Sequence, residues 1–494
     1  MNTSPGKNPA RRTARKIGRG ALLVAAGIAL VRGADAPARF TGLWDVAALS
    51  RVPDHEWGAE ADGVREVCFT GEIYLARPTR VFAYLGVPEH PAGPVPGVVL
   101  LHGYGQNASR DWVKYWLARG CAAIALDLNG AGPHGPLPDG GPPLRTLNIF
   151  GPFPWDNPRN GWVYHAVADA LLGHSLLAAQ PGVDPERIAV NGLSWGGFAA
   201  CLVAGVDARL RAAAAVYGCG FLLEDSFWLQ FLPPMDCRRA AQWNALLDPG
   251  AFLPGVTCPF LFQVGANDPF FPPDSQRHSW DVCGGDKQAA LRPDMNHGDF
   301  WRWPHTEVEV NWFLDHHLKG APAPPRVRLL AETETRLTCA VDAAGPLEGV
   351  YLCVTTNTGP WSLRTWTRTR LEVTPARFTV TLPPERPLAA FVSVAARDAR
   401  GGLGWFSTPF LFRHGADSPD HIELGPARAA PGGVRLTGRK PRGRRILVEG
   451  TADWCHWTRL ATNDASGIEF ETLVPLPTEA DFQILRARSW DLVR

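Results

Sequence analysis

Uninterrupted apolar runs alternate with segments of helical periodicity through the middle of the chain. The apolar runs lie at residues 95–101, 121–127, 188–190, 211–217 and 259–265. Short runs of this kind are typical of strands buried on both faces of a parallel sheet. The segments with helical spacing lie between or after them, at 111–119, 164–179 and 304–318. With paired strands expected at 68–85, the alternation over 68–320 predicts a doubly wound α/β sheet covered by helices.

The pattern changes after a proline-rich linker at residues 321–325. From there, apolar and polar positions alternate with a period of two, which predicts strands rather than helices. The expected strands lie at 327–330, 349–355, 378–382 and 391–395, with further strand-like pieces at 445–449 and 468–475. We therefore expect a β-sandwich-like domain over 326–494. The last two pieces either complete that sandwich or form a small separate unit.

The N-terminus has the pattern of an export signal. Five basic residues between positions 11 and 19 precede an apolar run of eleven residues at 21–31, and Ala34-Asp35-Ala36 is a small-x-small cleavage sequence. A run of this length fits the core of a signal peptide better than a membrane span of about 20 residues. We predict a signal peptide over 1–36, with an uncleaved N-terminal anchor as the alternative, and hence a secreted, periplasmic or cell-surface protein.

Composition narrows the classes of function. The formal net charge of +1 gives no field that would attract nucleic acid or an anionic membrane. The ten cysteines include no Cys-x-x-Cys pair, so we expect no metal site and no cofactor. Three cysteines in apolar segments are expected to be buried thiols: Cys121, Cys201 and Cys258. Export would permit disulfides, and Cys219 with Cys237 or Cys258 with Cys283 are the candidate pairs.

The chemistry of the chain centres on residues 187–197. Ser194 lies in Gly192-Leu193-Ser194-Trp195-Gly196, directly after the strand at 188–190 and directly before a helix rich in small residues. This is the context of a nucleophile elbow, in which a strained turn exposes the serine hydroxyl. Gly192 and Gly196 leave room for the strand and the helix to approach each other. The alternative is a serine that serves only as a turn residue.

A serine nucleophile needs a base and an acid that orients the base. Asp268 follows the strand at 259–265, and His297 precedes the helix at 304–318, so the order along the chain is Ser, Asp, His. Asp268 could instead be a turn residue before Pro269. The rivals of these two residues are Asp274, Asp294, His278, His305, His316 and His317.

The oxyanion hole is expected from rigid backbone N–H groups. One is the amide of Trp195, and the other is the amide of Tyr104 in His102-Gly103-Tyr104-Gly105, with His102 fixing that loop. Two aromatic segments are candidates for a wall or cap over the cleft: the loop at 133–160 and the insertion at 221–252. Aromatic faces suit sugars and apolar groups, so we expect substrate contacts from Phe153, Trp155 and Trp162.

Four motifs together resemble the α/β-hydrolase superfamily. They are the loop at 102–105, the segment Asp127-Leu128-Asn129-Gly130-Ala131-Gly132, the elbow, and Met295-Asn296-His297-Gly298. Within the superfamily the chain is similar to the branch of acetylxylan esterases, dienelactone hydrolases and prolyl-oligopeptidase-like enzymes. Residues 265–275 also resemble the PhoPQ-activated pathogenicity-related proteins, which pair such a domain with a C-terminal β domain. The resemblance covers about residues 94–320 and implies Ser194, Asp268 and His297 as a triad. We expect the hydrolase domain itself to span 37–320.

These observations predict a secreted serine esterase that acts on a small-molecule or carbohydrate ester, acetyl esters included. The first alternative is an exopeptidase or amidase, in which Glu224 or Asp225 would hold a substrate amine. The second alternative is a surface glycan-binding protein whose hydrolase domain is vestigial. The sequence makes no prediction of the oligomeric state or of the disulfide connectivity.

Overall fold

The structure is a computed structural model. It describes residues 22–24, 41–151, 157–222, 226–228, 237–297, 308–373 and 376–413, together with the strands of residues 423–491. The chain divides into two compact units, residues 29–414 and residues 415–494 with 1–28. Each unit is described by itself.

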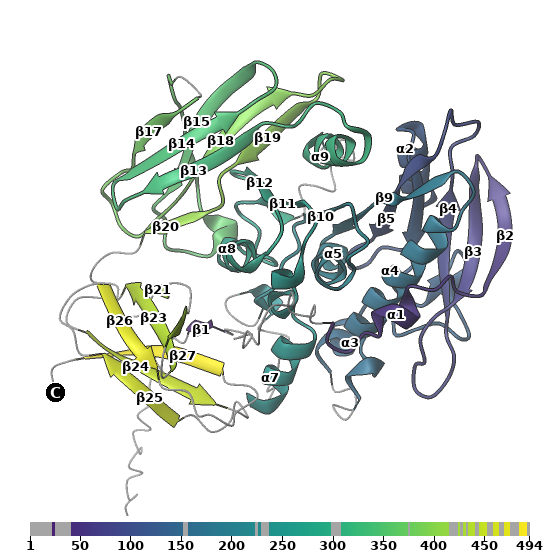
Figure 1. The fold of residues 1–494 in the computed structure, drawn as a ribbon, viewed down its shortest axis with the longest axis horizontal. Coiled ribbons are helices and arrows are strands. Elements are labelled where there is room, and N and C mark those ends of the chain that lie inside the picture. The colour runs from purple at the N-terminus through teal and green to yellow at the C-terminus, as the bar shows by residue number, and fades with distance from the viewer. Residues whose placement is uncertain are drawn as a thin grey trace, which may run out of the picture. The chain divides into compact units, whose positions relative to one another are not determined.

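The larger unit is built on a mixed sheet that confirms the predicted α/β architecture (Figure 1). Its α/β part has the strand order β2 (His55–Ala61), β3 (Val64–Thr70), β4 (Arg80–Gly86), β6 (Ala122–Leu126), β5 (Val95–Leu101), β9 (Val183–Leu193), β10 (Ala212–Val216), β11 (Phe260–Gly265) and β12 (Lys287–Arg292). Strands β6, β5, β9, β10, β11 and β12 are parallel to one another, whereas β2, β3 and β4 run antiparallel to their neighbours. The sequence did not predict β2 or β12.

Helices cover both faces of this sheet (Figure 1). One face carries α2 (Arg110–Ala118) and α9 (Val308–Lys319), and the other carries α1 (Val46–Leu49), α4 (Trp162–Ala178), α5 (Trp195–Val206) and α8 (Pro273–Val282). The helices predicted at 111–119, 164–179 and 304–318 therefore correspond to α2, α4 and α9. Shorter elements complete the connections: β7 (Ala131–Gly132), β8 (Gly135–Pro136), α3 (Thr146–Phe150), α7 (Cys237–Leu246) and the 3-10 turns at Pro158–Asn160, Pro249–Ala251 and Leu253–Gly255.

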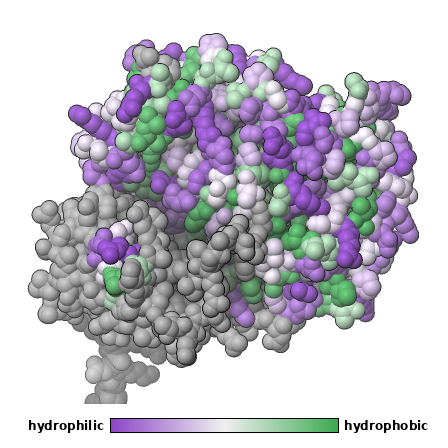
Figure 2. Space-filling model, in the orientation of Figure 1, coloured by the Kyte–Doolittle hydropathy of each residue, from purple (hydrophilic) through white to green (hydrophobic). Residues whose placement is uncertain are grey.

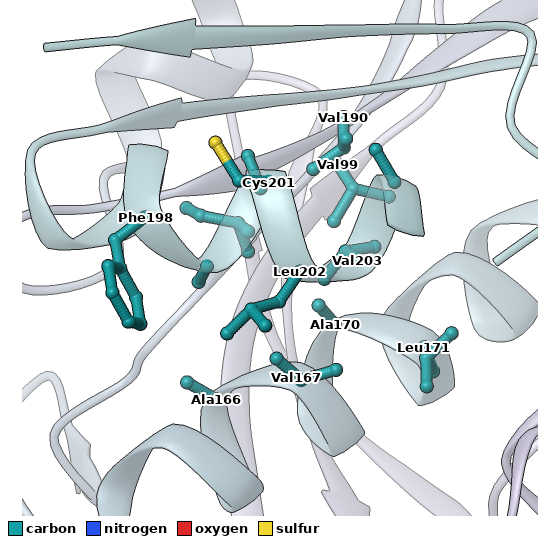
Figure 3. Close-up of a cluster of buried hydrophobic side chains, with 14 of the residues drawn as sticks. Val99, Ala166, Val167, Ala170, Leu171, Val190, Phe198, Cys201, Leu202 and Val203 are labelled. Atoms are coloured by element: carbon teal, nitrogen blue, oxygen red, sulfur yellow. The ribbon is translucent and has the colours of Figure 1, made fainter. Parts of the chain in front are cut away.

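The elbow helix α5 lies at the centre of one core, and all of its residues are buried. Figure 3 shows Phe198, Leu202 and Val203 of α5 beside Ala166 and Val167 of α4. A helix that is buried on every side has no use for polar residues, which explains why α5 is made only of apolar and glycine residues. The core below this helix holds the elbow in place.

The β-sandwich continues the sheet of the α/β part. At Ala289 and Ser407, β12 pairs antiparallel with β19 (Leu403–Ser407). From β19 the sheet runs on through β18 (Leu388–Arg397), β15 (Leu347–Thr355) and β16 (Thr367–Arg370), with β20 (Leu411–Arg413) also on β18. The second layer is β13 (Arg326–Glu332), β14 (Arg336–Asp342) and β17 (Phe378–Thr381). One hydrophobic cluster extends from the face under α2 and α9 into this sandwich.

The smaller unit contains two sheets. In one, β23 (Gly433–Arg439) pairs with β21 (Glu423–Leu424), β22 (Arg428–Ala430) and β26 (Glu469–Val474). The other comprises β1 (Leu22–Val24), β27 (Ile484–Asp491), β24 (Arg444–Thr451) and β25 (Thr458–Asn463). The strands predicted at 445–449 and 468–475 are confirmed as β24 and β26. Leu22–Val24 comes from the predicted signal core, and the rest of residues 1–36 lies outside the described residues.

The described cysteines correct one expectation. Cys219, Cys258 and Cys283 are buried thiols, so the proposed bridges between Cys219 and Cys237 and between Cys258 and Cys283 are not formed. Cys121, Cys201 and Cys258 are buried thiols, as predicted. In the described ranges, no helix has both the length and the apolar character needed to cross a membrane. The coloured face in Figure 2 is mostly hydrophilic, with apolar residues in small scattered groups.

Candidate active site

Ser194 lies at the turn between β9 and α5. Its backbone has φ 58° and ψ −119°, which is a strained conformation for a residue with a side chain. The Ser194 amide donates to the carbonyl oxygen of Val216 on β10, at 2.9 Å, and so fixes the turn to the neighbouring strand. The geometry is that of a nucleophile elbow. Ser194 is only 4% exposed, so the hydroxyl is more recessed than the sequence suggested.

Two glycines make the tight turn possible. A Cβ atom on Gly192 would lie 2.0 Å from the carbonyl oxygen of Gly196, and one on Gly196 would lie 2.0 Å from the carbonyl oxygen of Leu101. Both distances are far below van der Waals contact with backbone atoms that cannot move away. The sequence argument that Gly192 and Gly196 allow strand and helix to approach is therefore confirmed.

The structure brings His297 between Ser194 and Asp268. Its Nε2 atom lies 3.0 Å from Ser194 Oγ, and its Nδ1 atom lies 2.7 Å from Asp268 Oδ2. The imidazole ring is packed among the rings of Tyr217, Phe270 and Phe271, with centroid distances of 4.4, 4.9 and 5.8 Å. These contacts restrict the orientation of the imidazole.

Asp268 is held by its own turn after β11. The residue is fully buried, and its Oδ1 atom accepts the N–H groups of Phe270 at 2.8 Å and Phe271 at 3.1 Å. The second oxygen, Oδ2, is thereby turned toward His297. A buried carboxylate with hydrogen bonds on both oxygens is well compensated for its loss of water.

The other candidates for the catalytic acid and base make contacts away from Ser194. Asp274 accepts the indole N–H of Trp361, and Asp294 accepts the backbone N–H of Trp366. The remaining histidines have other surroundings. The Nδ1 atom of His316 bonds the carbonyl oxygen of Ala321, His278 packs against Phe221, His317 packs against Phe313, and His305 lies outside the described residues.

The loop at 102–106 lies directly against the nucleophile, since a Cβ atom on Gly103 would come 2.9 Å from Ser194 Cβ. The buried His102 accepts the Leu128 N–H at Nε2, at 2.8 Å, so its ring proton is on Nδ1 and is donated to the carbonyl oxygen of Gly103, at 2.9 Å. Burial lowers the pKa of His102, which keeps the ring neutral as these bonds require. His102 thus fixes the loop, as expected.

The two candidate oxyanion donors occupy the expected elements. The amide of Trp195 is the first N–H of α5, a group that has no partner inside its own helix, and no side chain in the described part of the chain caps α5. Tyr104 follows Gly103 on the fixed loop and is 47% exposed. Helix N-termini of this kind favour negative charge.

The predicted aromatic wall is only partly described. Phe153 and Trp155 lie outside the described residues. Trp162 is 1% exposed, its indole N–H donates to the carbonyl oxygen of Leu128, and its ring packs edge-on against Trp195 at 5.9 Å. The structure therefore places Trp162 in the core behind the elbow.

Sequence reasoning missed the aromatic residues that surround His297. Phe270 contacts the imidazole, and Phe227, which is 37% exposed, lies with its ring 4.5 Å from that of Phe270. A signal was present, because Phe270 and Phe271 follow Asp268-Pro269 directly in the sequence. Phe227 lies in the insertion at 221–252, which the sequence had marked as a candidate cap.

Comparison with known proteins gives two family matches. The acetyl xylan esterase family model matches residues 40–224, and the model of the PhoPQ-activated pathogenicity-related proteins matches residues 203–369. Acetyl esterase Axe7A of Xylanibacter ruminicola is 21% identical over 266 residues, which cover 50% of this chain and 58% of the relative. The chain thus spans less than two thirds of the length of that relative.

Two solved structures are similar to about half of the chain. The acetyl xylan esterase from Paenibacillus sp. R4 has a TM-score of 0.45 and 22% identity, covering 56% of this chain and 92% of its own. Acetyl xylan esterase 1 from Thermoanaerobacterium sp. JW/SL YS485 has a TM-score of 0.45 and 21% identity, with 55% and 91% covered. Residues 40–224 of the chain are thus similar to the acetyl xylan esterase family, and residues 203–369 are similar to the PhoPQ-activated pathogenicity-related proteins.

Proposed function

We propose that the protein is a serine esterase that removes acyl groups, acetyl among them, from carbohydrate or other small esters. The observation that carries this proposal is the hydrogen-bonded line from Ser194 Oγ through His297 to Asp268 Oδ2, on a strained elbow. The match of residues 40–224 to the acetyl xylan esterase family supports the choice of an ester substrate.

The proposed reaction follows from the positions of the atoms. His297 Nε2 removes the proton of Ser194 Oγ as that oxygen attacks the acyl carbon, and Asp268 stabilises the imidazolium that forms. The N–H groups of Tyr104 and Trp195 donate to the oxyanion of the tetrahedral intermediate. When the intermediate collapses, the C–O bond to the alcohol breaks and His297 protonates the leaving oxygen.

The second half of the reaction uses the same groups. A water molecule gives a proton to His297 Nε2 and attacks the acyl-enzyme carbonyl carbon. The new tetrahedral intermediate expels Ser194 Oγ, which takes the proton back from His297, and the free acid leaves. The protein ends the cycle in its starting protonation state, so no further reactant is needed.

The aromatic residues beside His297 support a substrate with an apolar or sugar face. Phe270 contacts the imidazole, and the exposed Phe227 contacts Phe270, so an aromatic surface leads from solvent toward the reacting atoms. Such surfaces bind the faces of sugar rings as well as short acyl chains. The exopeptidase or amidase alternative depends on Glu224 or Asp225, which lie outside the described residues, and stays a prediction.

Export belongs to the same proposal. The basic residues and apolar run at 11–31 support a secretory route, to the periplasm, the cell surface or the medium. N-terminal sequencing of the mature protein purified from the expressing cell checks this. A start near residue 37 would support cleavage of a signal peptide, and a start at Met1 would contradict it.

One comparison tests the enzymatic proposal. Purified protein is incubated with p-nitrophenyl acetate, with acetylated xylo-oligosaccharides and with aminoacyl-p-nitroanilides, beside Ser194→Ala and the control Ser175→Ala, a buried serine on α4 that bonds Leu171 and Arg209. We expect acetate release by the wild type and by S175A but not by S194A. Equal rates for wild type and S194A would contradict the esterase, and turnover of the anilides alone would favour the peptidase.

A further inference from the structure

We propose that the loop of the β-sandwich at residues 357–366, here called the brace, holds the loops that carry Asp268 and His297 in register. Asn267 is the positioning residue through which it acts. The inference rests on the proposed function, since it assigns a role in the same reaction to a different part of the fold. It also assigns the β-sandwich a role in positioning the catalytic residues of the hydrolase domain.

Asn267 connects the loop that carries Asp268 (the acid loop) to the loop that carries His297 (the base loop) and to the brace. It immediately precedes Asp268 and is 6% exposed. Its side-chain Nδ2 donates to the carbonyl oxygens of Trp361, at 2.9 Å, and Arg364, at 2.6 Å. Its backbone N–H donates to the carbonyl oxygen of Met295, at 3.0 Å, on the loop that leads to His297. A single residue therefore joins the acid loop, the base loop and the brace.

Two further bonds fasten the brace on either side of this contact. The indole N–H of Trp361 donates to Asp274 Oδ2 on α8, at 2.9 Å, beyond Asp268 in the chain. The backbone N–H of Trp366 donates to Asp294 Oδ1, at 3.1 Å, three residues before His297. Asp294 has a φ of 56°, so the base loop passes through a left-handed conformation where the brace holds it.

The brace is itself well anchored. Asn357 Oδ1 accepts the backbone N–H and the hydroxyl of Thr365, both at 2.9 Å, and Arg364 Nε donates to the carbonyl oxygen of Gly359, at 2.8 Å. The rings of Trp361 and Trp366 are buried among sandwich aromatics, with Trp366 packed 5.2 Å from Phe391. The sandwich core thus fixes the atoms that contact Asn267.

Chemistry explains why an asparagine stands at this position. Both acceptors are carbonyl oxygens, so the partner must supply two N–H donors, which a primary amide does and a carboxylate cannot. An alanine would remove both bonds, and an aspartate would in addition set a negative charge against two carbonyl oxygens. Because Asp268 and His297 lie on separate loops, loss of the Asn267 hydrogen bonds would allow their relative position to change. A misplacement of about 1 Å costs about 100-fold in rate.

The test compares Asn267→Ala and Asn267→Asp with a matched control, Arg326→Ala. Arg326 also joins the sandwich to the hydrolase part, but through Asp286 at the opposite end of β12. With p-nitrophenyl acetate we expect N267A to lower kcat by about 10- to 100-fold with little change in KM, and N267D to lower it further. R326A should keep the kcat and the KM of the wild type.

A milder variant distinguishes the loss of positioning from a simple loss of folding. Trp361→Phe keeps an aromatic ring, although a smaller one, and removes the indole donor to Asp274, so we expect a smaller loss of kcat in the same direction. Thermal melting of all variants shows whether R326A and N267A are destabilised alike. If N267A retains kcat within about twofold of wild type, or if R326A loses as much kcat as N267A, the brace proposal is overturned.

A readout without substrate separates this inference from the proposed function. In protein labelled with ¹⁵N-histidine, the Nδ1 proton of His297 bonded to Asp268 gives a low-field proton resonance, assigned by its absence in His297→Gln. Weakening of that resonance in N267A but not in R326A supports the brace, and an unchanged resonance in both contradicts it. Equal ester rates for wild type and S194A would reject the esterase while leaving this measurement valid.

Discussion

Asp268 presents one carboxylate oxygen to the backbone and the other to His297. Its Oδ1 atom accepts the N–H groups of Phe270 and Phe271, and its Oδ2 atom lies 2.7 Å from His297 Nδ1. The two oxygens are therefore not interchangeable, because only one faces the imidazole. This asymmetry determines which tautomer of His297 faces Ser194.

Asp268→Asn should lower kcat by about 10³- to 10⁴-fold while KM changes little. The amide oxygen would remain with the N–H groups of Phe270 and Phe271, so the NH₂ group would face His297 Nδ1 and make it an acceptor. The ring proton would then be on Nε2, and the ring could no longer take a proton from Ser194. Steady-state rates with p-nitrophenyl acetate check this. A loss of less than tenfold would show that Asp268 does not set the tautomer.

Gly103→Ala should also disable the reaction, by a different route. The added methyl group would lie 2.9 Å from Ser194 Cβ and 3.0 Å from the carbonyl oxygen of Leu193, so the loop carrying the Tyr104 amide must move. Loss of one oxyanion donor costs about 10²- to 10³-fold in kcat. Gly93→Ala is the control, because a Cβ atom there meets nothing within 4 Å. Unchanged kcat in G103A would exclude this loop from the oxyanion hole.

Because of His165, we expect the free energy of unfolding to decrease in mild acid. Its ring packs edge-on against Tyr74 and Tyr164, and burial lowers its pKa to about 4. The unfolded chain binds a proton near the ordinary histidine pKa of about 6.5, whereas the folded protein resists it. Stability is therefore full above that pH and is lost as pH falls toward 4, by about 3 kcal/mol in total.

The measurement for His165 is urea denaturation of wild type and His165→Gln between pH 7.5 and about 4. The glutamine does not titrate, so the difference in unfolding free energy between the two proteins should shift in favour of the variant as pH falls. Other buried histidines contribute equally to both proteins and cancel. A pH-independent difference would mean that His165 is not buried as a neutral ring.

For Asp169 we expect the opposite dependence of folding stability on pH. The residue is buried on α4, and burial, followed by the nearby charges of Glu72 and Asp127, raises the pKa of its carboxyl group well above 3.8. A raised pKa in the folded state gives stability that is present below 3.8 and is lost as pH rises. Asp169→Asn imitates the protonated acid, so we expect it to raise Tm by a few degrees at pH 7. The gain should shrink toward zero near pH 4, and a lower Tm at pH 7 would contradict it.

Most of the fold could be predicted because its signals are local. The uninterrupted apolar runs at 95–101 and 259–265 identified β5 and β11, and the glycines around Ser194 identified the elbow. Strand β12 was missed because its short run, Lys287–Arg292, begins and ends with a basic residue and has a glutamine within it. Its apolar residues number only three, which is too few to distinguish a buried strand from a loop.

Contacts between distant segments could not be predicted in the same way. Nothing in the sequence around Asn267 indicates that its side chain bonds carbonyl groups 94 and 97 residues further along the chain. Trp162 shows a second limit, because a tryptophan suits a core as well as a substrate wall. Its position between Leu128 and Trp195 depends on the packing of α4 against the elbow.

The pairing of β12 with β19 has a consequence for how the protein can be divided. Without residues 388–413, β12 would be the last strand of the hydrolase sheet, with its backbone N–H and C=O groups open to any other chain. Exposed edges of this kind invite intermolecular pairing and aggregation. The apolar side chains that α9 shares with the sandwich would be uncovered at the same time. The sandwich therefore protects this edge of the sheet against self-association. A fragment that ends at the proline-rich linker would lack this protection.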